Sequence, residues 1–161
     1  MSSLHTFLSE DYFFMLGLKK LFSSHPFGSD YFIVDVETTS RSQVEQCSFL
    51  NKKVYAFISN DFDYYALCHL ENVIFIDRRS EMSEVLYCLS INHTHFNYRV
   101  KSKLSEREND VLTCLQEGLD TREIGLRLGV NIKNIYASRA RLMNKMHVGN
   151  RIYLYRNIVR Q

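Results

Sequence analysis

The feature that most constrains the fold is a repeated helix-start pattern between residues 104 and 146. Ser105 is followed three positions later by Glu108, the spacing of a capping box, in which side chains and backbone amides at a helix start satisfy one another. Asp120 and Glu123 repeat this spacing fifteen residues further along the chain. Each such cap stabilises a helix by about 1 kcal/mol. The pattern therefore predicts two short helices in succession.

The ends of these helices are also marked. Gly118 and Gly129 follow the two helical stretches, where glycine readily adopts the left-handed conformation that ends a helix. Asn131 is the expected cap of a third helix, which should run from Ile132 to about Met146. Two helices joined by a tight turn containing glycine are typical of a helix-turn-helix.

The third helix has two predicted faces. On a helical wheel at about 100° per residue, the side chains within about 60° of Ile135 form a core-facing stripe. They are Ile132, Ser138, Arg139, Leu142 and Met146, and the Arg139 head group is expected to reach outward from the edge of the stripe. The outward face, with its two borders, holds small or hydrogen-bonding side chains: Lys133, Ala137, Ala140, Arg141 and Asn144, with Asn134 and Tyr136 at the borders. Alanines allow close approach, and the polar groups can reach base edges or phosphates in a major groove of DNA.

The charge distribution supports an anionic partner for this part of the chain. Residues 1–100 carry a net charge of −4 and residues 101–161 a net charge of +6, which together give the total of +2. No Asp or Glu follows Glu123, whereas eight cations do: Arg127, Lys133, Arg139, Arg141, Lys145, Arg151, Arg156 and Arg160. A solvated basic surface is the alternative interpretation, but the caps, the turn and the small outward residues all agree with double-stranded DNA as the partner.

The same residues resemble the LuxR/FixJ-type helix-turn-helix domain of bacterial transcription regulators. The resemblance covers nearly all of residues 101–161 and rests on Leu104, Ser105, Arg107, Glu108, Val111, Leu112, Gly118, Leu119, Glu123, Ile124, Leu128, Val130, Ile135, Lys145, Val148, Asn150 and Arg151. Gly125, Ser138 and His147 depart from residues common in the family. Those departures could alter stability or base preference without changing the fold.

The resemblance implies roles for individual residues. Tyr136, Ala137 and Ala140 would read bases, and phosphates would be contacted by Thr121, Arg122 and Lys145. A fourth helix over residues 151–159 would supply a dimer contact through Ile152, Tyr155 and Val159. Packing within the domain explains that apolar set equally well.

The first part of the chain alternates between strand and helix patterns. Strands are expected at 4–9, 31–36, 52–59 and 72–77, and helices at 11–24, 61–70 and 80–91, the last capped by Ser80. Such alternation predicts an α/β domain with a parallel sheet covered on both faces. The polar residues 93–103 are the expected linker, so the predicted domains are 1–92 and 104–161.

The first domain resembles, more weakly, a truncated response-regulator receiver. Asp35 would occupy the position of the phosphorylated aspartate and Ser59 that of the family's hydroxyl residue. Only Glu10 and Asp11 could form the acidic pair that holds Mg²⁺, and Asp77 occupies the usual lysine position, where an anion repels phosphate. The sequence therefore predicts a receiver-like domain that does not accept phosphate and acts by protein contact.

Other classes of function have less support. The four cysteines form no C-x-x-C pair, the pair His93 and His95 has no third ligand, and no nucleophile–base pair is apparent. We therefore expect no metal, cofactor or enzymatic activity. With no signal segment or membrane span in the sequence, a cytoplasmic, nucleoid-associated location is expected.

The leading hypothesis is a phosphorylation-independent transcription regulator that binds DNA as a homodimer or with a partner regulator. A phosphorylation-dependent regulator using Asp35 is one alternative. The other is a protein that sequesters another regulator without binding DNA.

Overall fold

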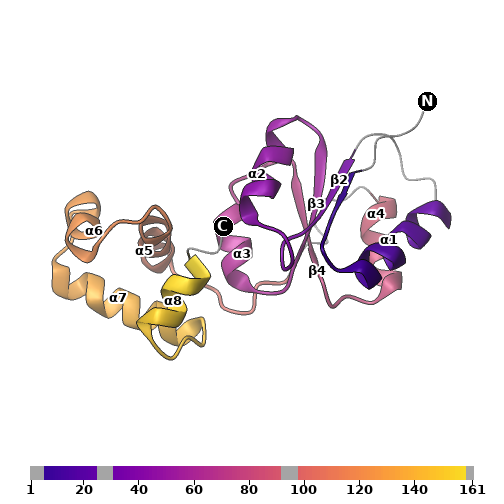
Figure 1. Ribbon diagram of the computed structural model, residues 1–161. Helices are drawn as coiled ribbons and strands as arrows, with labels where there is room; N and C mark the ends of the chain where they lie inside the picture. Colours follow the sequence, from indigo (N-terminus) through magenta and orange to yellow (C-terminus); the bar gives the residue numbers. More distant parts are fainter. Residues whose placement is uncertain (1–5, 25–30, 92–97, 159–161) are drawn as a thin grey trace. The chain divides into compact units, whose positions relative to one another are not determined.

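The computed structural model describes residues 6–24, 31–91 and 98–158. The chain divides into two compact units, with the boundary between Arg99 and Val100 (Figure 1). The first is an α/β unit and the second is entirely helical, as the sequence predicts. The domain limits 1–92 and 104–161 stay a prediction, because residues 1–5, 92–97 and 159–161 lie outside the described part of the chain.

The N-terminal unit alternates strands and helices, with one helix more than the sequence predicts. Its elements are β1 (Thr6–Leu8), α1 (Tyr12–Ser24), β2 (Tyr31–Asp35), α2 (Arg41–Phe49), β3 (Lys53–Ile58), α3 (Asp61–Leu67), β4 (Val73–Asp77) and α4 (Met82–Ile91). The four strands form one parallel sheet in the order β1-β2-β3-β4. Because all four strands run in the same direction, their carboxyl ends lie at a common edge.

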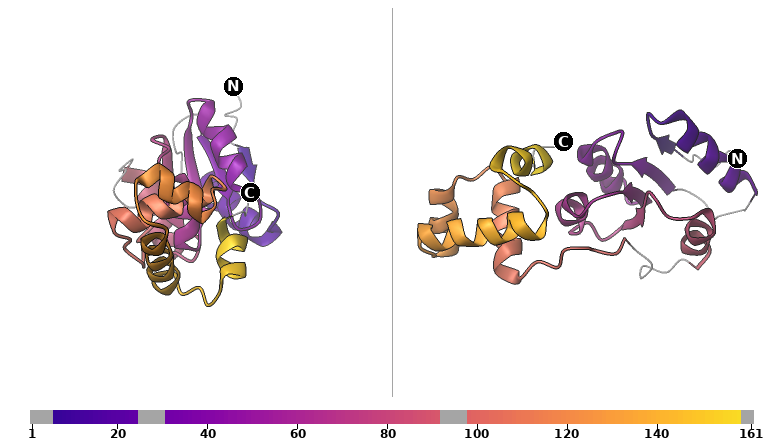
Figure 2. Two further views of the ribbon diagram at one scale, coloured as in Figure 1. Left: turned by 90° about the vertical axis from the view of Figure 1, so that its left-hand side faces the viewer. Right: turned by 90° about the horizontal axis from the view of Figure 1, so that it is seen from below.

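Helices cover both faces of this sheet. Helices α1 and α4 lie on one face, and α2 and α3 lie on the other (Figure 1 and Figure 2). Leu21 of α1 and Leu89 of α4 pack on strand residues Ile33, Phe57 and Ile76 in one continuous apolar core. Burial of such a side chain stabilises a protein by roughly 1.5–3 kcal/mol relative to its exposure. Two-sided burial explains the almost uninterrupted apolar sequence of these strands.

Two local predictions for this unit need correction. Helix α2 has no counterpart among the predicted elements, because only Val44 and Cys47 bury apolar side chains in it and the helical period is weak. Its start is nevertheless capped, since the Ser40 side chain accepts a hydrogen bond from the backbone N–H of Gln43. Ser80 does not cap α4, which begins two residues later at Met82.

Several residues of the expected linker make tertiary contacts. Tyr98 is buried, its N–H donates to the carbonyl of Phe75 at 2.9 Å, and its hydroxyl donates to Asp61 at 2.7 Å. Burial and the Asp61 carboxylate raise the pKa of Tyr98. In the helical unit, the Ser102 hydroxyl donates to the backbone carbonyl of Lys145 at 2.5 Å. Residues 93–97 of the expected linker, including both histidines, lie outside the described residues.

The C-terminal unit consists of α5 (Glu106–Gln116), α6 (Thr121–Leu128), α7 (Ile132–Lys145) and α8 (Arg151–Ile158). The predicted capping boxes at the starts of α5 and α6 are both present with reciprocal hydrogen bonds. Gly118 and Gly129 have φ values of +84° and +62°, so both take the left-handed conformation expected of them. Each of these helix boundaries therefore follows from local sequence chemistry.

Ile132 is not part of the core-facing stripe of α7. Its side chain, at the first residue of the helix, is 44% exposed, although it is predicted to face the core. The stripe instead centres on Ile135 and Leu142, which are at most 1% exposed. The turn before α7 packs closely against α6: a Cβ atom at Gly125 would lie 2.9 Å from the carbonyl oxygen of Val130. This contact accounts for glycine rather than alanine at that position.

Candidate functional site

The outward face of α7 is exposed as predicted. On the opposite side, Ile135 and Leu142 are buried against the rest of the helical unit. All seven residues of the predicted outward face are exposed: Lys133, Asn134, Tyr136, Ala137, Ala140, Arg141 and Asn144. The helix therefore presents donors and cations around two small side chains on its exposed side.

The position of α7 is fixed at its start and along its buried side. The Asn131 side chain accepts a hydrogen bond from the backbone N–H of Lys133 at 2.9 Å, which caps the helix. Buried Leu112 of α5 and Ile124 of α6 belong to the core of this unit. An exposed helix held this firmly can offer its side chains in a fixed arrangement, as direct reading of bases requires.

Glu108 ties the end of α7 to the start of α5. Its carboxylate lies 2.6 Å from Nζ of Lys145 and accepts a hydrogen bond from the backbone N–H of Ser105 at 2.8 Å. It is 3% exposed. The hydrogen bond from Lys145, followed by those from Ser105, lowers the pKa of Glu108. Lys145, a predicted phosphate contact, therefore already has an anionic partner within its own unit.

A second polar cluster lies at the carboxyl edge of the sheet in the N-terminal unit. The Arg78 guanidinium contacts three carboxylates: Nε is 2.9 Å from Asp35 Oδ1, Nη2 is 2.7 Å from Asp11 Oδ2, and Nε is 3.5 Å from Glu37 Oε2. Asp35 is completely buried and also accepts a hydrogen bond from the Ser9 hydroxyl at 2.8 Å. This cluster coincides with the predicted phosphoacceptor position.

Sequence reasoning missed Arg78 and assigned the inhibitory role to Asp77. The Asp77 carboxylate instead accepts hydrogen bonds from the backbone N–H and Nε of Arg79, at 2.9 and 3.2 Å. Glu10 is exposed, and Asp11 is the member of the acidic pair that joins the cluster. The signal that could have revealed Arg78 is its place directly after a buried strand, at the edge where Asp35 also ends a strand.

The charged groups of the cluster shift the pKa values of one another. Burial opposes the charged form of Arg78, but hydrogen bonds with Asp35 and Asp11 outweigh it and raise the pKa of Arg78. The pKa of Asp11 is lowered, first by a hydrogen bond from the backbone N–H of Phe14 and then by Arg78. The Phe14 ring lies 4.7 Å from the guanidinium carbon and covers one side of it. The guanidinium of Arg78 is therefore surrounded by carboxylates and an aromatic ring of its own unit.

The receiver resemblance implies a Mg²⁺ ion at this position, and these residues do not fit one. Mg²⁺ needs free oxygen ligands in near-octahedral geometry. Here the Asp11 and Asp35 carboxylates are hydrogen-bonded to one guanidinium, which occupies the oxygens that the ion would need. Within residues 6–24, 31–91 and 98–158, no group of three or more His, Cys, Asp or Glu side chains has the arrangement of a metal site.

Comparison with known proteins decides the assignment of the helical unit. Residues 102–158 match the family described as bacterial regulatory proteins, luxR family. This segment forms a LuxR-type domain. Comparison with curated protein sequences gives no significant match.

The fold of the whole chain is similar to that of RcsB response regulators. A structure of two RcsB dimers bound to two parallel DNAs aligns with a TM-score of 0.54 and 15% identity, covering 96% of each chain. RcsB of Salmonella enterica serovar Typhimurium, bound to a promoter with the phosphomimetic BeF3−, aligns with a TM-score of 0.54 and 14% identity, covering 98% of each chain. At such identity the likeness shows a shared fold.

Two predicted phosphate contacts lie at the start of α6 in the LuxR-type domain. Arg122 is exposed, whereas Thr121 is half-buried and its hydroxyl oxygen lies 3.5 Å from Nη1 of Arg139. Arg139 does not reach outward as expected, since it is only 8% exposed. Its guanidinium carbon lies 4.9 Å from the centre of the Tyr136 ring, on the outward side of α7.

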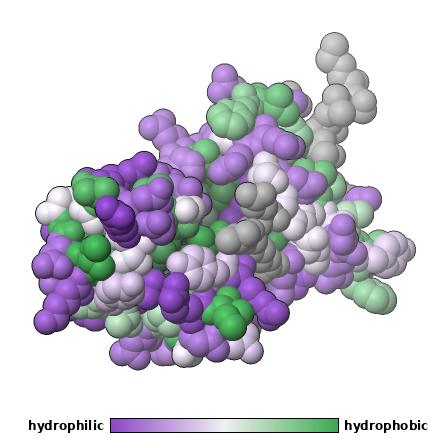
Figure 3. Space-filling view, turned by 60° about the vertical axis from the view of Figure 1, so that its left-hand side comes forward, coloured by the Kyte–Doolittle hydropathy of each residue, from purple (hydrophilic) through white to green (hydrophobic). Residues whose placement is uncertain are grey.

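Helix α8 has an inward and an outward side. Leu154 and Ile158 are buried in the LuxR-type domain, so part of the apolar character of α8 serves internal packing. Of the predicted dimer residues, Ile152 is 68% exposed, Tyr155 is half-buried, and Val159 lies outside the described residues. Figure 3, which brings the LuxR-type domain forward, shows apolar side chains as separate patches among polar ones.

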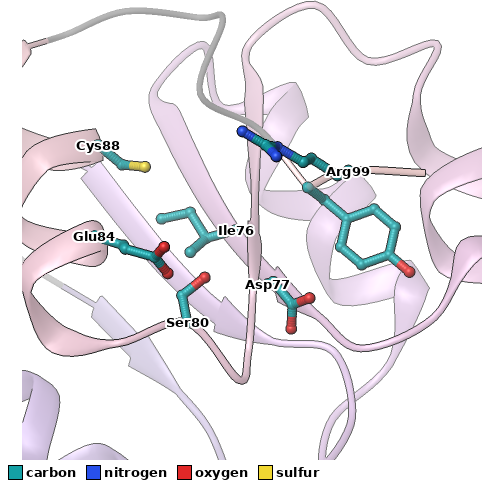
Figure 4. A pocket seen from close by; sticks show the side chains of 7 residues that line it. Ile76, Asp77, Ser80, Glu84, Cys88 and Arg99 are labelled. Carbon is teal, nitrogen blue, oxygen red and sulfur yellow. The ribbon is translucent and has the colours of Figure 1, made fainter. Parts of the chain in front are cut away.

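A pocket of about 260 Å³ lies at the end of β4 in the N-terminal unit. Figure 4 shows Ser80, Glu84 and Cys88 on one side of it and Asp77 and Arg99 on the other. The lining contains two carboxylates and one guanidinium, so it favours neither an anionic nor a cationic ligand. Nothing in the sequence indicated this pocket.

No helix of the described residues is both long and apolar enough to cross a membrane.

Proposed function

We propose that this protein is a sequence-specific DNA-binding regulator of bacterial transcription that acts without phosphorylation. The observation that carries the proposal is the exposed face of α7, on which every predicted reading residue is accessible. Ala137 and Ala140 allow the helix backbone to approach base edges, and Tyr136 lies beside them. Lys133 and Arg141 can reach phosphates or bases from the same face.

Independence of phosphorylation is supported by the acidic cluster. Asp35 at the acceptor position is fully buried, and its carboxylate is occupied by Arg78 and the Ser9 hydroxyl. A phosphoryl group would have to displace that ion pair and would find Asp11 and Glu37 beside it without a metal ion to neutralise them. The N-terminal unit then serves protein contact rather than phosphate sensing.

A dimer, either of two identical chains or with another regulator, is the proposed form that binds DNA. One of the structures with a similar fold contains two RcsB dimers bound to two parallel DNAs. In this chain, Ile152 and Tyr153 on α8 expose apolar side chains that a second subunit could cover. Such a protein would act in the cytoplasm, at the nucleoid.

Selection of random duplex DNA by the full-length protein tests this function. The expected result is an enriched motif with two-fold symmetry, whose half-sites lie about one helical turn apart. Binding without enrichment would contradict sequence-specific reading, and the absence of binding would favour sequestration of another regulator.

Variants of the outward face locate the reading helix. Lys133→Ala and Arg141→Ala should each weaken binding to the selected DNA, and loss of a phosphate contact should reduce the salt dependence by about one ion. Arg107→Ala, on the exposed side of α5, is the matched control and should leave binding unchanged. Unaltered affinity in both test variants would contradict the placement of α7 in the groove.

A further inference from the structure

Arg139 is a buried cation whose contacts are with neutral groups. It is 8% exposed, and in the part of the chain that the structure describes no Asp or Glu forms an ion pair with it. Its contacts are a long hydrogen bond of 3.5 Å from Nη1 to the Thr121 hydroxyl and the stacking on the Tyr136 ring.

Burial of a charge in this manner is unfavourable. A guanidinium carries five N–H donors, and removal from water costs free energy unless an anion or several acceptors replace the water. The same chain meets this need at Arg41, which is 7% exposed and whose Nε lies 2.8 Å from the buried Asp63 carboxylate. Arg139 differs from Arg41 in that the described residues of its unit do not supply such an anion.

The surroundings of Arg139 favour an anion from outside. Thr121 is the first residue of α6, so the guanidinium lies at a helix N-terminus, where the backbone carries partial positive charge. Arg122, which follows Thr121 in α6, is an exposed cation. The two carboxylates of this helix start, on Asp120 and Glu123, are engaged in the capping box through hydrogen bonds of 2.8 Å to backbone N–H groups.

We propose that Arg139 binds a phosphate of the DNA backbone, together with the Thr121 hydroxyl. This inference rests on the proposed DNA-binding function and adds a contact that the outward face of α7 does not include. The phosphate supplies the anion that a buried guanidinium requires. A guanidinium suits this role because it can offer two parallel donors to phosphate oxygens.

The stacking contact gives Arg139 a second effect on recognition. Tyr136 is 50% exposed on the reading face, and its ring lies against the guanidinium that holds the phosphate. Binding of the phosphate therefore fixes the orientation of a base-reading side chain relative to the DNA backbone. Arg139 links the sequence-independent contact to the sequence-specific one.

The test compares full-length wild type with Arg139→Met and Arg139→Lys on the DNA selected by the wild type. Arg139→Met should fold with unchanged or raised stability in urea, because it replaces a buried charge among neutral groups with an apolar side chain. Its affinity should fall about tenfold, and the slope of log K against log salt should decrease by about 0.9. Arg139→Lys should keep the slope, since it keeps the charge.

A contact map of the phosphates separates binding from a purely structural role. Neutral methylphosphonate at one backbone position should weaken the wild type and leave Arg139→Met unaffected. A salt slope unchanged in Arg139→Met, or equal sensitivity of both proteins at every position, would overturn the inference while leaving DNA binding itself intact. Arg107→Met is the control, because it removes an exposed cation of α5 and should behave as wild type. Failure of wild type to bind any DNA would instead overturn the proposed function.

Discussion

Two arginines in the two units show opposite ways of placing a cation below the surface. In the N-terminal unit, Arg78 lies within ion-pair distance of Asp11, Asp35 and Glu37. In the LuxR-type domain, Arg139 is buried against a hydroxyl and an aromatic ring. In the first site the cation has carboxylate partners within the protein, whereas in the second it has neutral neighbours.

The difference bears on which of the two sites can bind an anion. A receiver-like position whose carboxylates already hold a guanidinium has lost the free oxygens that metal and phosphate need. A buried guanidinium with neutral neighbours keeps its capacity for an anion. An arginine therefore occupies the carboxylates at the receiver-like site, whereas in our proposal another arginine, Arg139, binds an anion from outside.

Removal of Arg78 should have the largest effect. Arg78→Met leaves the fully buried Asp35 carboxylate without its cation, and loss of one partner of a buried pair costs about 3 kcal/mol or more in stability. Urea unfolding of the full-length protein measures this loss. Arg79→Met, at an adjacent side chain that is 57% exposed, should cost less than about 1 kcal/mol. An equal loss of stability in the two variants would show that Arg78 is not needed to neutralise buried Asp35, and would contradict the comparison with Arg139.

Glu108→Gln should have the next largest effect, in the LuxR-type domain. The variant loses the ion pair with Lys145 and weakens the capping box of α5, which together should cost about 1–3 kcal/mol. Chemical denaturation with Glu106→Gln as the exposed control measures the difference. A cost as small as that of the control would mean that the Lys145 contact does not hold α7 to α5.

The cap of α6 provides a smaller test. Asp120→Ala removes the acceptor for the backbone N–H of Glu123 and should cost about 1 kcal/mol. The thermal unfolding temperature should fall by several degrees. An unchanged temperature would show that the α6 start, and with it the Thr121 position, does not depend on this cap.

The smallest expected effect is on acid stability. Folding lowers the pKa values of Asp11 and Glu108 from their ordinary values of 3.8 and 4.5. Their stabilising contribution is therefore complete above those ordinary values and is lost as the pH falls through the lowered folded values. Unfolding followed between about pH 3 and 6 should show a weaker pH dependence in Glu108→Gln than in wild type. Identical pH profiles would contradict the ion pair.

The sequence predicts those parts of the molecule that depend on local chemistry. The caps at Ser105 and Asp120, the left-handed glycines and the buried strands all follow from residue types at short spacing. Helix α2 could not be found in this way because its apolar pattern is weak. The roles of Arg78 and Arg139 also depend on residues distant in the chain, such as Asp35, forty-three positions from Arg78. Local patterns carry no information about such pairings.

The most direct test of the account is the affinity of the full-length protein for its selected DNA, before and after incubation with acetyl phosphate and Mg²⁺. We predict tight, sequence-specific binding that the treatment leaves unchanged, because Arg78 occupies the Asp35 carboxylate. An affinity that rises after treatment in wild type but not in Asp35→Asn would contradict the account and identify a phosphorylation-dependent regulator.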